Sequence, residues 1–241
     1  MKITRLGALY QLSFLPRIFP VNCYLVEQDD GLTLIDAALP FSKNGILDAA
    51  RQIGKPITRI VLTHAHDDHV GSLDALKETL PDVPVYISAR DARLLSGDVS
   101  LDPGEPNTPI RGGVPKKLKT RADVTLADGD RVGSLLAVAV PGHTPGSMAF
   151  LDTRSRAMIA GDAMQTRGGT AVSGQVKPLF PFPALATWNR QAALASARKL
   201  RECLPTLLAV GHGRMLDDPL QAIDSAILTA ERTLAKNGKG A

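Results

Sequence analysis

The 241-residue sequence predicts an α/β (α+β) protein made of two related halves. Short apolar runs of strand length recur between Gly, Pro and Asp residues, and longer amphipathic segments separate some of these runs. Two of the runs, "LTLIDAALP" and "AMIAGDAMQ", lead into Asp-Ala and are each followed downstream by a helical segment. We therefore expect one domain over residues 1–241, with two pseudo-symmetric halves that meet near residue 125 and pack sheet against sheet.

Eight short apolar runs have the length and residue types of buried strands, and "QDDG" between the first two is a hairpin signal. The predicted strands are Asn22–Glu27, Leu32–Asp36, Arg59–Thr63, Val85–Ser88, Leu135–Val140, Met148–Asp152, Ala157–Gly161 and Leu207–Gly211. Four longer segments favour helices. These are Ser42–Ile53, Ser72–Leu80, Thr187–Leu204 and Pro219–Lys236. In the third, Leu194, Ala197, Leu200 and Leu204 form an apolar stripe that indicates a packing surface.

Two stretches show neither the helical nor the strand periodicity of apolar residues and are predicted to be long loops. Ser96–Thr120 is rich in Gly and Pro, and loops of this length in compact domains are often lids or binding loops. Met164–Trp188 is apolar for a loop. Its Phe180, Phe182 and Trp188 are candidates to wall a substrate pocket, although they would equally well cap an edge of the core.

Composition excludes several classes of protein. With 44% hydrophobic and 22% charged residues, the chain is neither disordered nor fibrous. The net charge of +4 is modest, and its only dense run, Lys116, Lys117 and Lys119, is typical of a solvated loop rather than a nucleic-acid surface.

The sequence also predicts a cytoplasmic location. Cys23 and Cys203 lie far apart in apolar runs, which indicates buried thiols in a reducing compartment. The first twenty residues lack the apolar core and cleavage site of a signal peptide, and no window is apolar for long enough to span a bilayer.

All five histidines follow strand-like runs, where a scaffold can hold ligands in fixed geometry. His64, His66 and His69 follow the third predicted strand, and His143 and His212 follow the fifth and the eighth. A lone histidine in such a place is more often structural, but the His-x-His-x-x-His spacing favours metal binding. Asp162 and Asp36 end strands in the same manner.

The candidate ligand set indicates the kind of metal. Imidazoles with a minority of carboxylates and no cysteine suit Zn(II), with Fe(II), Mn(II) and Co(II) as alternatives, and disfavour Ca(II) and Mg(II). Five histidines and two or more aspartates are too many for one tetrahedral ion. They fit two ions that share a carboxylate.

Four motifs in order resemble those of the metallo-β-lactamase superfamily, in its lactonase and glyoxalase II-like branch. "HAHDDH" is similar to the His-x-His-x-Asp-His signature, and "PGHTPGS", "AGDAM" and "VGHG" match the later motifs. "LTLIDAALP" resembles the first motif of the family. The resemblance extends from about Asn22 to about Gly213 and implies a four-layer αβ/βα sandwich.

The resemblance also implies the ligands of each ion. One ion would be bound by His64, His66 and His143, and the other by Asp68, His69 and His212, with Asp162 bridging them. Asp36 would accept a hydrogen bond from a ligand histidine, and Asp67 would start a helix.

By this resemblance the protein is a dinuclear-metal hydrolase that uses a metal-bridging hydroxide to attack a small ester, lactone or thioester. Asp68 would be the catalytic residue that orients the water and carries its proton to the leaving group. Alternatives are a phosphodiesterase or nuclease of the same superfamily, a glyoxalase II-like glutathione thioesterase and, least favoured, a non-enzymatic metal-binding regulator. The expected partner is a small-molecule substrate, without nucleic acid or membrane, and a homodimer is compatible with the family.

Overall fold

The computed structural model describes residues 1–237 and divides the chain into two compact units. Unit 1 comprises Met1–Asp98 and Gly113–Ala127. Unit 2 comprises Val99–Gly112 and the described residues from Asp128 onward. Among the described residues, every helix is too short or too polar to cross a bilayer.

Unit 1 contains a seven-stranded sheet whose strands lie in sequence order. The strands are β1 (Lys2–Leu6), β2 (Leu9–Phe14), β3 (Val21–Gln28), β4 (Gly31–Ile35), β5 (Ile57–Val61), β6 (Val85–Ser88) and β7 (Val124–Leu126). Strands β1 to β4 pair antiparallel, whereas β4 to β7 pair parallel. The parallel strands direct their carboxyl ends to one edge of the sheet, so the loops after β4, β5 and β6 are neighbours.

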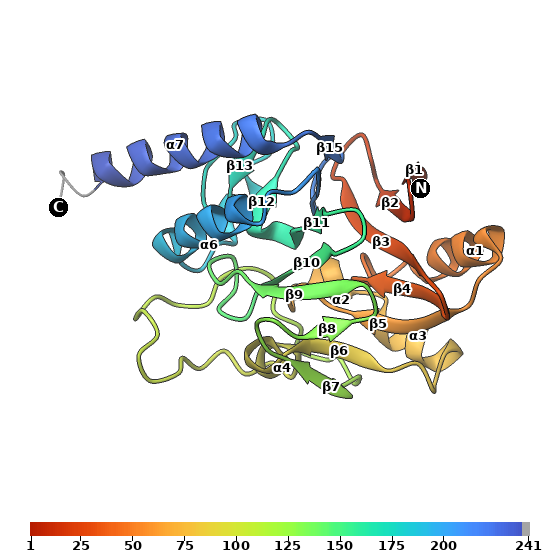
Figure 1. Cartoon of the computed structure of the whole chain (residues 1–241). Helices are drawn as coiled ribbons and strands as arrows, with labels where there is room; N and C mark the ends of the chain where they lie inside the picture. Colours follow the sequence, from red (N-terminus) through yellow and green to blue (C-terminus); the bar gives the residue numbers. More distant parts are fainter. Residues whose placement is uncertain (238–241) are drawn as a thin grey trace. The chain divides into compact units, whose positions relative to one another are not determined.

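Helices make the parallel crossovers of unit 1 (Figure 1). They are α1 (Lys43–Ile53), α2 (Asp67–Val70), α3 (Leu73–Thr79) and α4 (Ala89–Leu95). Helix α1 buries Ile46, Ala49 and Ala50, and a Cβ at Gly45 would lie 3.1 Å from the Phe14 ring, so this helix packs closely beside β2. At the start of α4 the Ser88 hydroxyl accepts a hydrogen bond from the Asp91 amide at 3.0 Å.

Unit 2 contains a six-stranded sheet in the order β15-β14-β11-β10-β9-β8 and a small β12-β13 hairpin. The strands are β8 (Arg131–Val132), β9 (Leu135–Ala139), β10 (Met148–Asp152), β11 (Ala157–Ile159), β12 (Met164–Gln165), β13 (Ala171–Val172), β14 (Leu207–Ala209) and β15 (Leu216–Asp217). A short 3-10 helix, η1 (Gly161–Ala163), follows β11.

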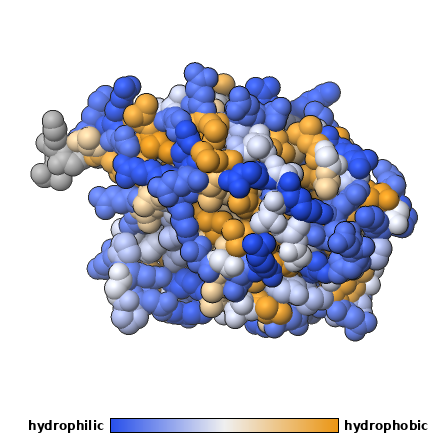
Figure 2. All heavy atoms as spheres, in the orientation of Figure 1, coloured by the Kyte–Doolittle hydropathy of each residue, from blue (hydrophilic) through white to orange (hydrophobic). Residues whose placement is uncertain are grey.

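The helices of unit 2 are α5 (Phe182–Leu185), α6 (Arg190–Glu202) and α7 (Leu220–Asn237), and α6 and α7 lie side by side (Figure 1). Helix α7 buries residues at helical spacing, namely Ile223, Ala226, Ile227 and Ala230. These residues share one core with β9, β10, β11, β14 and α6. Figure 2 shows hydrophilic residues with hydrophobic ones between them over α7, as expected for an amphipathic surface helix.

The predicted fold class, mixed α/β with more than one sheet, is confirmed. All eight predicted strands and all four predicted helices are present, with their ends shifted by up to three residues. The Ser96–Thr120 stretch is a loop, as predicted.

Other parts of the sequence were interpreted wrongly or missed. The N-terminal hairpin β1-β2, helix α4 and the short strands β7, β8 and β15 were not predicted. The Met164–Trp188 stretch is not one loop, because it contains β12, β13 and α5. Cys23 is buried, but Cys203 is only partly buried; burial raises the pKa of both thiols.

Asp74 of α3 fastens the end of the long loop within unit 1. Its carboxylate accepts hydrogen bonds from the backbone amides of Lys119 and Thr120 at 3.0 and 2.7 Å, and from the Thr120 hydroxyl at 2.6 Å. Burial alone would raise the pKa of Asp74, but these hydrogen bonds together outweigh it and lower the pKa below the ordinary value.

We expect Asp74→Ala to lower the free energy of unfolding by about 1–3 kcal/mol at neutral pH, because three donors lose a charged acceptor. The folded-state pKa is depressed, so the stabilisation is complete above the unfolded-state pKa and disappears as the pH falls through the folded-state pKa. Urea unfolding of both proteins over a pH series measures this, and the two should converge in acid. A constant difference across the series would contradict the assignment.

Candidate metal centre

The topology of unit 1 places three polar segments at one edge of its sheet. Asp36 follows β4, the segment from Thr63 to His69 follows β5, and Asp91 lies in the helix after β6. Because these three strands are parallel neighbours, their carboxyl ends lie together. All of these residues except Asp67 and Asp68 are buried.

Asp36 organises the unit 1 group. Its Oδ1 accepts from the Thr63 amide at 2.7 Å, and its Oδ2 accepts from the Thr63 hydroxyl at 2.8 Å and lies 2.9 Å from His69 Nδ1. The residue has φ +63°, a left-handed backbone that aspartate tolerates better than most residues. Since an ionised carboxylate only accepts hydrogen bonds, it holds the hydrogen of His69 on Nδ1 and leaves Nε2 available as a ligand atom.

Thr63 determines in the same way which ring nitrogen of His64 carries the hydrogen. Its hydroxyl hydrogen is directed to Asp36, so the hydroxyl oxygen accepts from His64 Nδ1 at 3.0 Å. The ring centroid of His64 lies 4.9 Å from that of His66 and 4.2 Å from that of His69. The ligand atoms of His64 and His66, of His64 and His69, and of Asp68 and His69 lie within 4.8 Å of each other.

The two neighbouring aspartates of the motif differ. Asp68 places Oδ2 4.0 Å from His69 Nε2. Asp67 is the first residue of α2, as expected, and its amide donates to the Gly113 carbonyl at 2.7 Å. Desolvation and the negative charge of Asp68 raise the pKa of the Asp67 carboxyl, and Lys116 opposes them.

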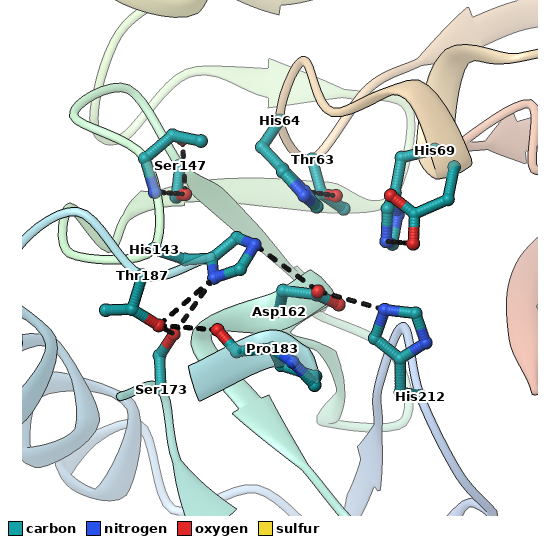
Figure 3. A network of polar contacts seen from close by, with 12 residues as sticks. Thr63, His64, His69, His143, Ser147, Asp162, Ser173, Pro183, Thr187 and His212 are labelled. Atoms are coloured by element: carbon teal, nitrogen blue, oxygen red, sulfur yellow. Dashed lines mark hydrogen bonds and ion pairs between the residues drawn. The ribbon is translucent and has the colours of Figure 1, made fainter. Parts of the chain in front are cut away.

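Unit 2 brings its three predicted ligands to one edge of its own sheet. Strands β9, β11 and β14 all run in the same direction, and they lead into His143, Asp162 and His212 respectively. Asp162 Oδ2 lies 3.4 Å from His143 Nε2 and 3.1 Å from His212 Nε2 (Figure 3). All three side chains are buried.

The predicted pocket residues of unit 2 have three different environments. The Phe180 ring is buried, 5.4 Å from His212 and 5.3 Å from the Phe182 ring. Phe182 is 51% exposed. Trp188 is buried, and its Nε1 donates to the Thr108 carbonyl at 2.9 Å, which ties it to the Val99–Gly112 segment.

Both units carry donor sets that fit divalent transition metals. Among the described residues, the groups that could hold a cation offer imidazole nitrogens, either alone or together with a carboxylate oxygen, and contain no thiolate. In His69 and His143 the Nδ1 atom faces an oxygen of the protein, so Nε2 is the atom left for coordination. These His/Asp groups therefore support a divalent metal cofactor.

Sequence reasoning missed four residues that contact the predicted ligands or the loop that carries them. Thr63 was detectable in principle, because it adjoins His64 at the end of a strand. Asp91 is fully buried and accepts from the Ala65 amide at 3.1 Å, between two histidines of the motif. Ser173 and Thr187 lie 3.1 and 3.5 Å from His143 Nδ1, and no local motif marks them.

Comparison with known proteins agrees with this chemistry. The model of the metallo-beta-lactamase superfamily matches residues 16–212. The uncharacterized protein YobT of Bacillus subtilis is 56% identical over 96% of this chain and 100% of its own length. The probable metallo-hydrolase YflN of the same organism is 30% identical over 80% of each chain. A hydroxyacylglutathione hydrolase of Gloeobacter violaceus is 28% identical over 61% of this chain and 50% of its own.

Solved structures share the fold. The crystal structure of TTHA1623 in a di-iron-bound form has 29% sequence identity and a TM-score of 0.61, covering 88% of this chain and 96% of its own. The family match spans most of the chain and includes every histidine motif. This chain therefore belongs to the metallo-beta-lactamase superfamily and is a metal-dependent hydrolase.

Proposed function

We propose that the protein hydrolyses a small ester, lactone or thioester with the help of two divalent ions, Zn(II) in the first place. The seven ligands would be those that the family motifs imply, namely His64, His66, Asp68, His69, His143, Asp162 and His212. The observation that carries the proposal is the orientation of the imidazoles. Nδ1 of His64, His69 and His143 faces an oxygen of the protein, which directs Nε2 to a ligand role.

Each residue then has a distinct task. When bound, divalent ions supply a water of lowered pKa and polarise the carbonyl under attack. Asp162 neutralises positive charge from a position where its Oδ2 faces two imidazoles, and Asp36 keeps His69 in one tautomer. Asp68 is partly exposed, so it can orient a water and pass a proton to the leaving group.

The surface around α5 supports an acyl or aromatic substituent on the substrate. Leu179, Phe182 and Leu185 are 85%, 51% and 61% exposed, and they flank Phe180, whose ring packs near His212. Exposed apolar residues in a cluster often mark a binding surface. The similarity to a hydroxyacylglutathione hydrolase supports a thioester as an alternative to a lactone or an ester.

Metal analysis of the purified protein and a substrate panel test the proposal. We expect two divalent ions per chain, and lactones, esters or thioesters should be hydrolysed faster than β-lactams and bis-p-nitrophenyl phosphate. Preferred phosphodiester hydrolysis with salt-sensitive RNA binding would favour the nuclease alternative instead. Bound metal without turnover of any substrate in the panel would favour the alternative of a non-enzymatic metal-binding regulator. The cytoplasmic location and the homodimer remain predictions.

A further inference from the structure

We propose that Ser173 and Thr187 are positioning residues for His143, because they determine which of its two ring nitrogens carries the hydrogen. The inference rests on the proposed function in one respect only, the role of His143 as a metal ligand. The hydrogen-bond chain itself lies entirely within unit 2.

Four groups form this chain (Figure 3). His143 Nδ1 lies 3.1 Å from Ser173 Oγ, and Ser173 Oγ lies 2.8 Å from Thr187 Oγ1. The Thr187 hydroxyl donates to the Pro183 carbonyl at 2.7 Å. The side chains of His143, Ser173 and Thr187 are all buried, so solvent does not compete for these hydrogen bonds.

The direction of every hydrogen bond follows from the last group. A carbonyl oxygen can only accept, so the single hydrogen of the Thr187 hydroxyl is directed to Pro183. The Thr187 oxygen must then accept from Ser173, which uses the single hydroxyl hydrogen of Ser173. The Ser173 oxygen is left to accept, and the only group that can donate to it from His143 is an Nδ1–H.

The second contact of the ring points the same way. His143 Nδ1 lies 3.5 Å from Thr187 Oγ1, whose own hydrogen is already used. Both hydroxyls therefore face Nδ1 as acceptors. The hydrogen is held on Nδ1, and the lone pair is held on Nε2, the atom that lies 3.4 Å from Asp162 Oδ2.

Backbone contacts hold the chain in place. Ser173 directly follows β13, and its amide donates to the Ala163 carbonyl at 3.0 Å, one residue after Asp162. Thr187 follows α5 and bonds the carbonyl four residues before it, an arrangement that threonine makes readily. Thr187 is thus fixed to α5, the helix that presents Phe182, and Ser173 is fixed to η1, which presents Asp162.

Nuclear magnetic resonance of the metal-free protein tests the tautomer directly. The chain has only five histidines, so their nitrogen signals can be assigned with single substitutions. In the neutral ring, His143 should carry its hydrogen on Nδ1. Thr187→Val and Ser173→Ala should give a mixture of tautomers or the Nε2–H form, and Thr187→Ser should restore the Nδ1–H form.

Zn(II) affinity, measured by competition with a chromophoric chelator, is the second measurement. Loss of a partner of a ligand histidine typically weakens metal binding about 10–100-fold, and we expect this for Thr187→Val but not for Thr187→Ser. Ser147→Ala is the matched control. It removes another buried hydroxyl, which lies 2.6 Å from Thr144 Oγ1 and accepts from the Thr144 amide at 3.0 Å rather than from the His143 ring, and it should preserve both the tautomer and the affinity.

The outcomes separate the two proposals. An Nε2–H tautomer in the wild-type protein, or an unchanged tautomer and affinity in Thr187→Val and Ser173→Ala, would overturn the inference. An Nδ1–H tautomer that depends on the two hydroxyls, in a protein that binds none of Zn(II), Fe(II), Mn(II) and Co(II), would support the inference and reject the proposed function. The wild-type tautomer is measured without Thr187→Val or Ser173→Ala, so the failure of either variant to fold does not prevent the test.

Discussion

Replacing Asp68 with asparagine should lower kcat by about 100- to 10,000-fold on the best substrate, the range typical of a lost acid–base group. Asparagine keeps the size of the side chain but cannot accept a proton and binds cations weakly. Asp68 Oδ2 lies 4.0 Å from His69 Nε2, and the side chain is 29% exposed, which suits a group that exchanges protons with water or a leaving group. Steady-state kinetics with metal analysis of the same sample measures the effect.

Asp67 offers a matched control in the adjacent position. It starts the same short helix α2, and its backbone amide donates a hydrogen bond to the Gly113 carbonyl, a contact that does not need the carboxylate. We therefore expect Asp67→Asn to keep both the metal and a kcat close to that of the wild-type protein. Wild-type turnover by Asp68→Asn, or an equal loss in both variants, would show that the assigned role of Asp68 is wrong.

The contrast between these neighbours illustrates what local sequence can determine. The spacing of His64, His66 and His69 after a strand was readable because all three lie in one loop. His143 and His212 were candidates because each follows a strand-like run, and the order of the motifs then linked them to the other ligands. The fold then supplies the reason, since β9, β11 and β14 run in one direction and end at one edge.

Residues that act through another residue were harder to predict. Ser173 and Thr187 lie 30 and 44 residues beyond His143 in the sequence. Serine and threonine are common in loops, so only the tertiary structure distinguishes these hydroxyls from solvated ones. Asp91 was missed for the same reason, because its partner, the Ala65 amide, belongs to another crossover.

The missed strands also have a physical explanation. Strand β1 is mostly exposed, so it lacks the alternation of apolar and polar residues that identifies a half-buried strand. Strands β12 and β13 have two residues each, too few for any period to be visible. The buried central strands were identified because their apolar runs are continuous.

Gly142→Ala should lower the free energy of unfolding by about 3 kcal/mol or more, because backbone strain and overpacking each cost about 1–3 kcal/mol. Gly142 has φ +148°, a conformation that side chains rarely adopt. An added Cβ would lie 2.4 Å from both the amide nitrogen and the Cα of Ala193. These are backbone atoms of α6, so no side-chain rotation relieves the contact. Urea unfolding followed by circular dichroism measures the loss.

Gly129→Ala separates strain from contact. Gly129 also has a positive φ, +90°, but nothing lies within 4 Å of the added Cβ, so we expect a loss of only about 1–2 kcal/mol. A similar loss in both variants would mean that the close contact between Gly142 and α6 is easily relaxed.

A larger loss in Gly142→Ala would instead show that α6 and the loop that carries His143 cannot move apart freely. The Asn189 amide donates to the Gly142 carbonyl at 2.9 Å. The added methyl group would therefore displace Asn189 and also His143, which directly follows Gly142. Metal affinity should therefore fall with stability in Gly142→Ala and stay unchanged in Gly129→Ala, which ties the glycine to the ligand that follows it.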